Sequence, residues 1–336
     1  MKFPRIVVKA PNWVGDAVMA GPFLEAVRAH WPKGHLAVLA RPQVRPVVER
    51  VAETDEIIDE SPHEVPELAG SLREEGFDVA FSLSSSQGAA LALALVRIPV
   101  RVGFRGGLRG FLFTEPVEPV SRYIHCTRHY LRLAEVAGAR VGRNPVPRWE
   151  VRPRDKAEAR KFLARQGARA GTKMVALAMG GAYGPSKRWF SASWAELGDR
   201  LALERGITPV LVGGEAERAG AERIAGLMAR HPLDATGKLS LAGTAALLSM
   251  CRAVVSNDSG LMHVSAALGV PTLGLLSSGN PSWTGPIGRK TAFLYAGVEC
   301  SPCFRRTCLP GRNYACLREL TVERVFTALM ASAGMR

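Results

Sequence analysis

The feature of this sequence that most constrains its fold is a regular alternation of short, β-branched apolar runs with longer segments of helical periodicity. In the first half we predict strand and helix in turn over Arg5–Ala10 and Asp16–His30, His35–Ala40 and Val44–Val51, Glu56–Asp59 and Glu64–Glu75, and Phe77–Leu83 and Gly88–Leu95. Strands that alternate with helices form parallel sheets covered by helices. The sequence therefore predicts an α/β fold.

The alternation lapses and then resumes. After a basic, Gly-rich connection and a helix over Thr127–Ala137, the stretch from Arg143 to Arg154 is rich in Pro and Arg and has no periodicity. The elements predicted beyond it are helices over Lys156–Gln166, Ser193–Arg205, Glu215–Arg230, Thr244–Met250, Gly260–Leu268 and Thr321–Ser332, and strands over Met174–Met179, Thr208–Val212, Ala253–Ser256 and Thr272–Leu276. A chain of 336 residues is long enough for two domains, which we place at residues 1–150 and 151–336. Two α/β halves of similar size favour ligands in a cleft between them, at the carboxyl ends of the strands.

Hydropathy argues against a membrane span. Hydrophobic residues make up 47% of the chain and charged residues 22%, which is typical of soluble globular proteins. The longest apolar run, Ala89–Val100, falls short of the ~18–20 residues of a spanning helix and contains Arg97. The first residues lack the apolar core of a signal peptide. We therefore predict a cytoplasmic protein.

The net charge of +14 indicates an anionic partner. Nucleic acid is disfavoured, because the basic residues are scattered, aromatic residues make up only 7% and no nucleic-acid-binding motif is present. Arg97, Arg101, Arg105 and Arg109 instead collect in one Gly-rich segment. That clustering favours a local site for an anion.

The first predicted strand leads into Asn12-Trp13-Val14-Gly15-Asp16. Asp16 has two interpretations: an N-cap for the following helix, or a carboxylate able to take a proton from a hydroxyl group. Gly15 would allow a tight turn that brings the backbone close to a ligand.

The most informative segment runs from Ala253 to His263, a buried strand that passes through a polar turn into a helix. Backbone N–H groups of Ser259, Gly260 and Leu261 at the helix start would face a phosphate, with His263 one turn further on. The alternative is an ordinary helix start with Asp258 or Ser259 as the N-cap.

Two further loops follow predicted strands. Gly180–Trp189 combines glycines, which permit close approach, with Lys187 as a point charge for a diphosphate. Gly213-Gly214 is followed by Glu215 and Glu217, which could hold ribose hydroxyls or simply favour the helix dipole. No Gly-x-Gly-x-x-Gly, Gly-x-Ser-x-Gly or Asp-x-Asp motif is present, which disfavours dinucleotide oxidoreduction, α/β-hydrolase chemistry and metal-dependent sugar transfer.

Four of the six cysteines, Cys300, Cys303, Cys308 and Cys316, have the spacing C-x2-C-x4-C-x7-C. In a cytosolic chain this clustering is compatible with a zinc or iron–sulfur knuckle, with reduced thiols or with redox pairs. The spacing leaves the choice open.

Taken together, Trp13–Asp16, Gly184–Trp189 and Asn257–His263 resemble the ADP-heptose:lipopolysaccharide heptosyltransferases of glycosyltransferase family 9, in order and spacing over nearly the whole chain. The last two segments look more like the heptosyltransferase II branch than the heptosyltransferase I branch. The resemblance implies a GT-B architecture, in which two Rossmann-like parallel-sheet domains face a cleft. It further implies that the N-terminal domain binds the acceptor and the C-terminal domain binds the nucleotide sugar, with inverting transfer and no essential metal or other cofactor.

The resemblance also implies roles for individual residues. Asp16, beside Gly15, would be the general base for the acceptor hydroxyl, and Lys187 would neutralise the ADP leaving group. The other donor-site residues would be Glu217 on the ribose, in preference to Glu215, Leu239 against the adenine, and Asp258, Ser259, Gly260 and His263 around the diphosphate and sugar. ADP-heptose would be the donor and a phosphorylated, heptosylated lipid A–Kdo core the acceptor. The basic segment Arg97–Arg109 would meet that acceptor at the cytoplasmic face of the inner membrane.

Other functions stay open at this point. Members of that branch often carry an Asn-Ser pair and a lysine where this chain has Ser84–Gly88, which leaves heptosyltransferase I or a later-acting enzyme with another acceptor as the nearest alternative. A nucleotide-sugar epimerase of similar shape would act on the free nucleotide sugar. A non-catalytic anion-binding protein would keep the fold and tolerate loss of Asp16.

Overall fold

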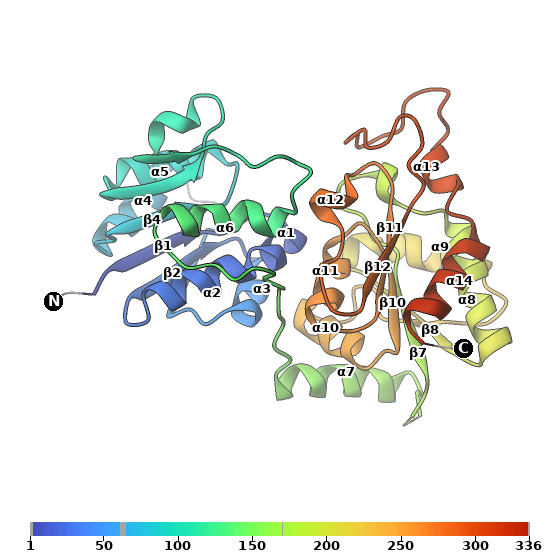
Figure 1. The fold of residues 1–336 in the computed structure, drawn as a ribbon. Coiled ribbons are helices and arrows are strands. Elements are labelled where there is room, and N and C mark those ends of the chain that lie inside the picture. The colour runs from blue at the N-terminus through green and yellow to red at the C-terminus, as the bar shows by residue number, and fades with distance from the viewer. Residues whose placement is uncertain (1–2, 61–64, 170, 335–336) are drawn as a thin grey trace. The chain divides into compact units, whose positions relative to one another are not determined.

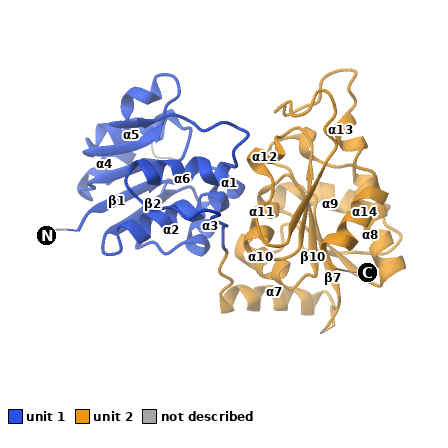
Figure 2. Cartoon of the chain, viewed as in Figure 1, with its two compact units in different colours: residues 1–148 blue, residues 149–336 orange. Residues whose placement is uncertain are grey.

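The computed structural model of the chain describes residues 3–60, 65–169 and 171–334. The chain divides into two compact units, unit 1 over Met1–Arg148 and unit 2 over Trp149–Arg336 (Figure 2). Each unit is a six-stranded sheet in which all strand pairs are parallel, covered by helices (Figure 1). The predicted α/β class with two parallel sheets is therefore confirmed.

Unit 1 has the strand order β3-β2-β1-β4-β5-β6. Its elements are β1 (Arg5–Lys9), α1 (Val14–Met19), α2 (Gly21–His30), β2 (His35–Ala40), α3 (Arg45–Val51), β3 (Glu56–Asp59), α4 (Val65–Glu74), β4 (Val79–Ser82), α5 (Gln87–Leu95), β5 (Val100–Phe104), the 3-10 helix η1 (Arg109–Leu112), β6 (Glu115–Val117) and α6 (Cys126–Val136). The chain builds outward from β1 in one direction and then from β4 in the other. The carboxyl ends of β1 and β4 therefore flank the topological switch point, where ligands bind in open α/β sheets.

Unit 2 repeats this plan with the order β12-β11-β10-β7-β8-β9. Its elements are α7 (Pro153–Arg165), β7 (Met174–Ala178), the 3-10 helix η2 (Pro185–Lys187), α8 (Ser191–Arg205), β8 (Thr208–Val212), the 3-10 helix η3 (Glu215–Glu217), α9 (Arg218–Leu227), β9 (Leu233–Asp234), α10 (Leu241–Ser249), β10 (Ala253–Asn257), α11 (Gly260–Ala267), β11 (Thr272–Leu276), α12 (Pro281–Thr284), β12 (Thr291–Tyr295), α13 (Ala315–Arg318) and α14 (Val322–Ser332). Its switch point lies between β7 and β10.

The cores are built on the central apolar strands, such as β7, β10 and β11, which are buried on both faces as in other parallel sheets. In unit 1, side chains of α4 and α5, among them Leu72 and Leu93, pack on the β1–β2 face. In unit 2, α8, α9 and α14 cover one face and α10 and α11 the other (Figure 1). Trp194 of α8 and Phe326 of α14 belong to the same cluster as Leu177 of β7.

Several predicted boundaries are wrong. The predicted helix over Asp16–His30 is two helices, because Gly21-Pro22 starts α2 with a residue that has no N–H. The Gly-rich connection before α6 contains two strands, β5 and β6, and the edge strands β9 and β12 were also missed. Glu64, the first residue of another predicted helix, lies outside the described residues.

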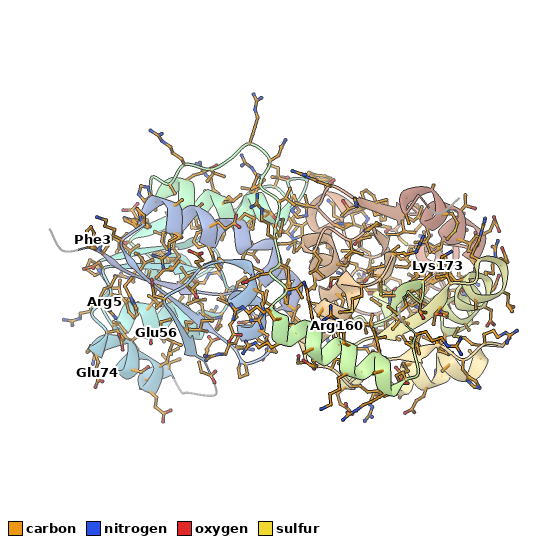
Figure 3. The ribbon with its side chains drawn as sticks, turned by 90° about the horizontal axis from the view of Figure 1, so that it is seen from below. Phe3, Arg5, Glu56, Glu74, Arg160 and Lys173 are labelled. Carbon is orange, nitrogen blue, oxygen red and sulfur yellow. The ribbon has the colours of Figure 1, made fainter. Side chains whose placement is uncertain are left out.

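Charged side chains occupy the surfaces of both units, as Glu74 on α4, Arg160 on α7 and Lys173 before β7 illustrate (Figure 3). Among the described residues, no helix has the length and apolar character needed to cross a bilayer.

Candidate active site

The two loops at the switch point of unit 2 bring Lys187 and Asp258 together. Lys187 ends η2, after β7, and Asp258 directly follows β10. Lys187 Nζ lies 2.6 Å from Asp258 Oδ2, and the two side chains are only 14% and 4% exposed. Thr284 Oγ1 of α12 donates a second hydrogen bond to Asp258 Oδ2, at 3.3 Å. Asp258 thereby holds an ammonium group at the carboxyl ends of the strands.

Asn257, the last residue of β10, fixes the spacing of these loops. Its Nδ2 donates to the carbonyl oxygens of Met179 and Gly180, at 2.7 and 3.1 Å, and its Oδ1 accepts from the Trp189 N–H at 3.2 Å. The side chain is fully buried. The loop Gly180–Trp189, called the Lys187 loop from here on, is therefore tied at both ends to β10, the strand that Asp258 directly follows.

The start of α11 presents backbone donors beside this ion pair. Ser259 is the N-cap residue of α11, as the alternative interpretation expects, but its side chain makes no capping hydrogen bond. The N–H groups of Ser259, Gly260 and Leu261 donate no hydrogen bond to any residue that the structure describes. His263, one turn into the helix, is 5% exposed. Unbonded N–H groups at a helix start attract anions.

The loop after β11 contributes buried hydroxyl groups that the sequence analysis did not single out. Ser277 Oγ donates to the Ser186 carbonyl oxygen at 2.7 Å, and Ser278 Oγ lies 3.1 Å from Ser186 Oγ. A side chain at Gly279 would approach Asp258 Oδ2 within 2.8 Å. The signal was present, because Ser277-Ser278-Gly279-Asn280 directly follows a predicted strand as the other site loops do.

Glu217 and Glu215 are both candidates for the ribose-binding residue, and the structure gives them different surroundings. Glu217 Oε2 accepts from the Gly214 N–H at 2.8 Å, and a side chain at Gly180 would come within 3.2 Å of the Glu217 carboxylate. Glu217 therefore lies between the ends of β7 and β8. Glu215 instead pairs with Arg218, at 2.8 Å.

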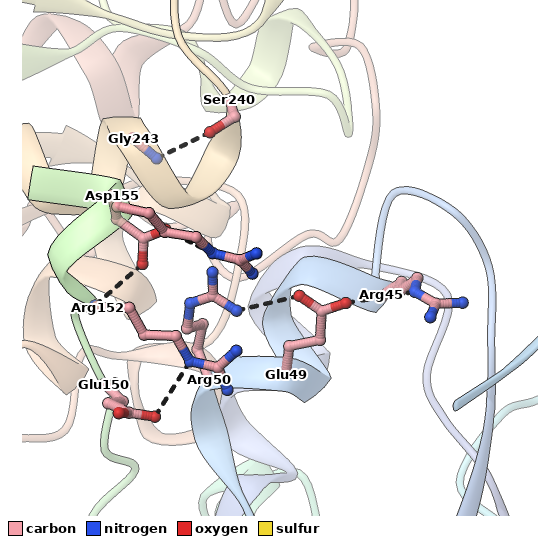
Figure 4. Close-up of polar contacts among 9 residues, drawn as sticks. Arg45, Glu49, Arg50, Glu150, Arg152, Asp155, Ser240 and Gly243 are labelled. Carbon is pink, nitrogen blue, oxygen red and sulfur yellow. Dashed lines mark hydrogen bonds and ion pairs between the residues drawn. The ribbon is translucent and has the colours of Figure 1, made fainter. Parts of the chain in front are cut away.

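Leu239 is half-buried in the turn before α10. The adjacent Ser240 caps α10 by accepting from the Gly243 N–H at 2.9 Å, and its Oγ donates to Glu158 Oε2 at 2.7 Å. Figure 4 shows the Ser240–Gly243 cap with the hydrogen bond from the Arg152 N–H to Asp155 that starts α7. The turn that carries Leu239 is thus held at both α10 and α7.

In unit 1, Asp16 is the third residue of α1, near the switch-point end of β1. The N-cap of α1 is Trp13, so the interpretation of Asp16 as an N-cap is wrong, and Gly15 has helical backbone rather than a tight turn. Asp16 is half-buried. Burial, followed by the negative charge of Asp16, raises the pKa of both Cys126 and Tyr130 in the packed helix α6. The Asp16 carboxylate is therefore close enough to α6 for its charge to act there.

Lys9, at the end of β1, was not identified from the sequence. Its side chain is fully buried, and its Nζ lies 3.0 Å from both Asn12 Oδ1 and Glu60 Oε2. Burial lowers the pKa of Lys9, while Glu60 opposes that change. Lys9 ties the turn that leads to Asp16 onto the sheet.

Three of the four arginines expected to form an anion site make contacts within unit 1. Arg101 Nε donates to the Leu112 carbonyl oxygen at 2.9 Å, and Arg109 donates to the Phe104 carbonyl oxygen at 3.1 Å. Arg105 pairs with Glu118, at 3.2 Å. The four charges are therefore spread from the turn before β5, through β5, to η1.

The four clustered cysteines lie on the segment between β12 and α14. Burial, followed by the nearby thiols of Cys300, Cys303 and Cys308, raises the pKa of Cys316. The Tyr314 N–H donates to Cys308 Sγ at 3.2 Å. Within the described ranges, no three cysteine, histidine or acidic side chains are arranged to hold a metal ion.

Comparison with known proteins gives consistent matches. Residues 65–313 match the family described as glycosyltransferase family 9 (heptosyltransferase). The lipopolysaccharide heptosyltransferase 1 of Pseudomonas aeruginosa is 38% identical over 160 residues, 44% of each chain. The lipopolysaccharide heptosyltransferase 2 of Escherichia coli K12 is 34% identical over 125 residues, 36% of each chain. These alignments thus span less than half the length of the curated relatives.

A solved structure extends the likeness to nearly the whole chain. The structure of the E. coli ADP-heptose lipopolysaccharide heptosyltransferase II superposes with a TM-score of 0.83 at 26% identity, covering 98% of both chains.

Proposed function

The chain belongs to glycosyltransferase family 9, the heptosyltransferases, and on this basis we propose that it moves L-glycero-D-manno-heptose from ADP-heptose to the heptosyl-Kdo2-lipid A core of lipopolysaccharide, with inversion at the anomeric carbon. The name of the solved E. coli relative supports both the donor and the acceptor class. Within the molecule, the observation that carries the proposal is the Lys187–Asp258 pair beside the start of α11, at the switch point of unit 2.

Unit 2 is the proposed donor domain. The diphosphate of ADP-heptose would accept hydrogen bonds from the N–H groups of Ser259 and Gly260 and lie against the Lys187 ammonium group. Asp258 carries negative charge and would repel the phosphates, so its role is to hold Lys187 in place. Glu217 would accept from the ribose hydroxyls, Leu239 would pack on the adenine, and His263 would line the sugar side.

Unit 1 is the proposed acceptor domain, with Asp16 as the general base. The acceptor hydroxyl gives its proton to the Asp16 carboxylate as its oxygen bonds to the anomeric carbon of the heptose. The bond from that carbon to the diphosphate breaks, and ADP leaves with the electron pair. Negative charge develops on the departing phosphate, where a fixed cation and helix N–H groups stabilise it. The residues of the chain thus account for both the proton and the charge, and we propose that no further cofactor takes part.

The lipid acceptor also suggests how unit 1 meets a membrane. Leu108, the N-cap residue of η1, and Phe111 within η1 are 78% and 86% exposed. They lie three residues apart, and in a 3-10 helix side chains at i and i+3 share one side. Arg105 is close by along the chain and largely exposed. Exposed apolar side chains flanked by cations favour a surface of anionic lipid. We place the protein at the cytoplasmic face of the inner membrane, with η1 in contact with the lipid.

Vesicle sedimentation tests this contact. The double variant Leu108→Ser/Phe111→Ser is expected to lose binding to vesicles that contain phosphatidylglycerol, while transfer to a water-soluble acceptor fragment continues. Leu203→Ser serves as the matched control, because Leu203 is 59% exposed on α8 of unit 2. Equal binding of both variants would remove η1 from the membrane contact.

The acceptor is tested by ADP release from ADP-heptose. We expect release with heptosyl-Kdo2-lipid A and none with Kdo2-lipid A, and Asp16→Asn should abolish it. The Pseudomonas relative named heptosyltransferase 1 makes Kdo2-lipid A the specific second candidate. Release only with Kdo2-lipid A would establish that alternative, and release with neither would refute heptosyl transfer to the inner core.

A further inference from the structure

The segment 301–306, which lies between Cys300 and Cys308 in the cysteine-bearing region, is bound to the loop that carries Lys187. The Ser186 N–H donates to the Arg306 carbonyl oxygen at 3.1 Å, and Ser186 Oγ donates to the Arg305 carbonyl oxygen. Tyr183 Oη donates to the Phe304 carbonyl oxygen. Segment 301–306 is therefore packed against the Lys187 loop.

The same segment is bound to the loop after β11. The Cys303 and Phe304 N–H groups donate to the Ser278 carbonyl oxygen, at 3.1 and 2.8 Å. Ser301 Oγ donates to the Ser277 carbonyl oxygen. Segment 301–306 therefore spans two of the loops that surround Asp258 and has little freedom to move relative to them.

Arg306 is the residue of this segment whose side chain reaches the Lys187 loop. Its Nε donates to the Tyr183 carbonyl oxygen at 2.7 Å. Its guanidinium carbon lies 6.0 Å from the centroid of the Tyr183 ring, and Lys187 Nζ lies 5.0 Å from the same centroid. A side chain at Gly184 would fall 2.5 Å from the Arg306 carbonyl oxygen, so the two backbones are in close contact. The two cations thus share one aromatic ring.

The charge of Arg306 is not neutralised by any carboxylate that the structure describes. Lys187 is paired with Asp258, whereas Arg306 pairs with no carboxylate of the described residues and is exposed. Its Nε is used by Tyr183, which orients the guanidinium and leaves the two terminal amino groups to bind a ligand. A guanidinium group held in this way matches two oxygens of a phosphate.

We propose that Arg306 is a further donor-binding residue, which supplies a second cation for the diphosphate of the nucleotide sugar. The inference rests on the proposed function, in which ADP is the leaving group. It also gives the cysteine-bearing region a function, because segment 301–306, which carries Arg306, is part of that region.

Isothermal titration calorimetry with ADP and with adenosine tests this role. Arg306→Ala is expected to weaken ADP binding about 10-fold or more, the effect of losing a charge-assisted hydrogen bond, and to leave adenosine binding within about twofold. Arg306→Lys should recover part of the ADP affinity. Arg305→Ala is the matched control, because it removes the same charge one residue away, where the hydrogen bond to the Lys187 loop is made by the backbone carbonyl oxygen and not by the side chain. This variant should behave as the wild type.

The outcomes separate this proposal from the proposed function. Wild-type protein that does not bind ADP would refute the donor assignment and the role of Arg306 together. Wild-type binding that Arg306→Ala leaves unchanged, or equal losses with Arg305→Ala, would refute only the role of Arg306. Equal weakening of ADP and adenosine by Arg306→Ala would show that Arg306 shapes the loop without binding the diphosphate.

Discussion

Replacing Lys187 with methionine should separate the stability of the site from its chemistry. Methionine keeps an unbranched apolar side chain of similar length and removes the ammonium group. Asp258 would then be left 4% exposed without its cation, with Thr284 as a remaining hydrogen-bond donor. Asp258→Asn instead leaves the Lys187 ammonium group without its carboxylate. Because Lys187 is 14% exposed, its side chain can turn toward water. The two single variants should therefore differ in cost.

The magnitude follows from the geometry. Unit charges 2.6 Å apart attract by about 6 kcal/mol at an effective dielectric constant of about 20, and the cost of desolvating both groups offsets much of that attraction. Removing one partner of a buried pair costs about 3 kcal/mol or more. For a domain of this size, Lys187→Met should lower the Tm by about 10 °C, and Asp258→Asn by about a third of that. The double variant Lys187→Met/Asp258→Asn leaves no charge at this pair of positions and should recover most of the loss.

The catalytic rate of these variants should not parallel their stability. Without the cation on the departing phosphate, both Lys187→Met and the double variant should lose at least about 10²-fold in kcat. Thermal unfolding followed by circular dichroism gives the stability, and ADP release gives the rate. If Lys187→Met is as stable as the wild type, or if the double variant regains activity along with stability, our account of the pair is wrong.

Two further predictions concern the framework of each unit. Burial, with a smaller contribution from Arg109, lowers the pKa of His129 from 6.5 to about 4. Between these two pH values the unfolded chain binds a proton at this residue that the native protein does not bind. The free energy of unfolding should therefore fall by roughly 3 kcal/mol as the pH drops from about 6.5 to about 4. His129→Phe, which keeps a ring stacked on Phe104, should remove that part of the pH dependence in urea unfolding; an unchanged slope would contradict the pKa assignment. Asn257→Ala leaves three backbone groups, two of them buried, without their partner, and should cost about 2–4 kcal/mol in urea unfolding and raise the KM for ADP-heptose. A stability within about 0.5 kcal/mol of the wild type would show that Asn257 does not hold the loops.

The sequence predicted the parts of the fold that local patterns determine. The strands β2, β3, β8 and β11 have the predicted bounds, because β-branched and apolar runs are bounded by turn residues. Strand β5 was missed because it contains Arg101 and Gly103. Tertiary contacts explain both: Arg101 donates to the Leu112 carbonyl oxygen, and a side chain at Gly103 would collide with the Phe113 ring.

The site shows the same division. The loops that carry Lys187 and Asp258 were found from glycines and polar turns after predicted strands, and the structure places the two residues 2.6 Å apart. Lys9 could not be found, because a lysine in an apolar strand has no local signal for burial; only the folded sheet brings Glu60 to its Nζ. Arg306 lies more than a hundred residues from Tyr183 in sequence, so its contact with the Lys187 loop depends wholly on the tertiary structure.

The central claim, transfer of heptose to the inner core, is tested most directly by mass spectrometry of the acceptor itself. Purified protein is incubated with ADP-heptose and heptosyl-Kdo2-lipid A, with Asp16→Asn as the control. Our account predicts an acceptor that gains one heptosyl residue with the wild type and none with the variant. An unmodified acceptor with the wild-type protein, or equal modification by Asp16→Asn, would contradict it.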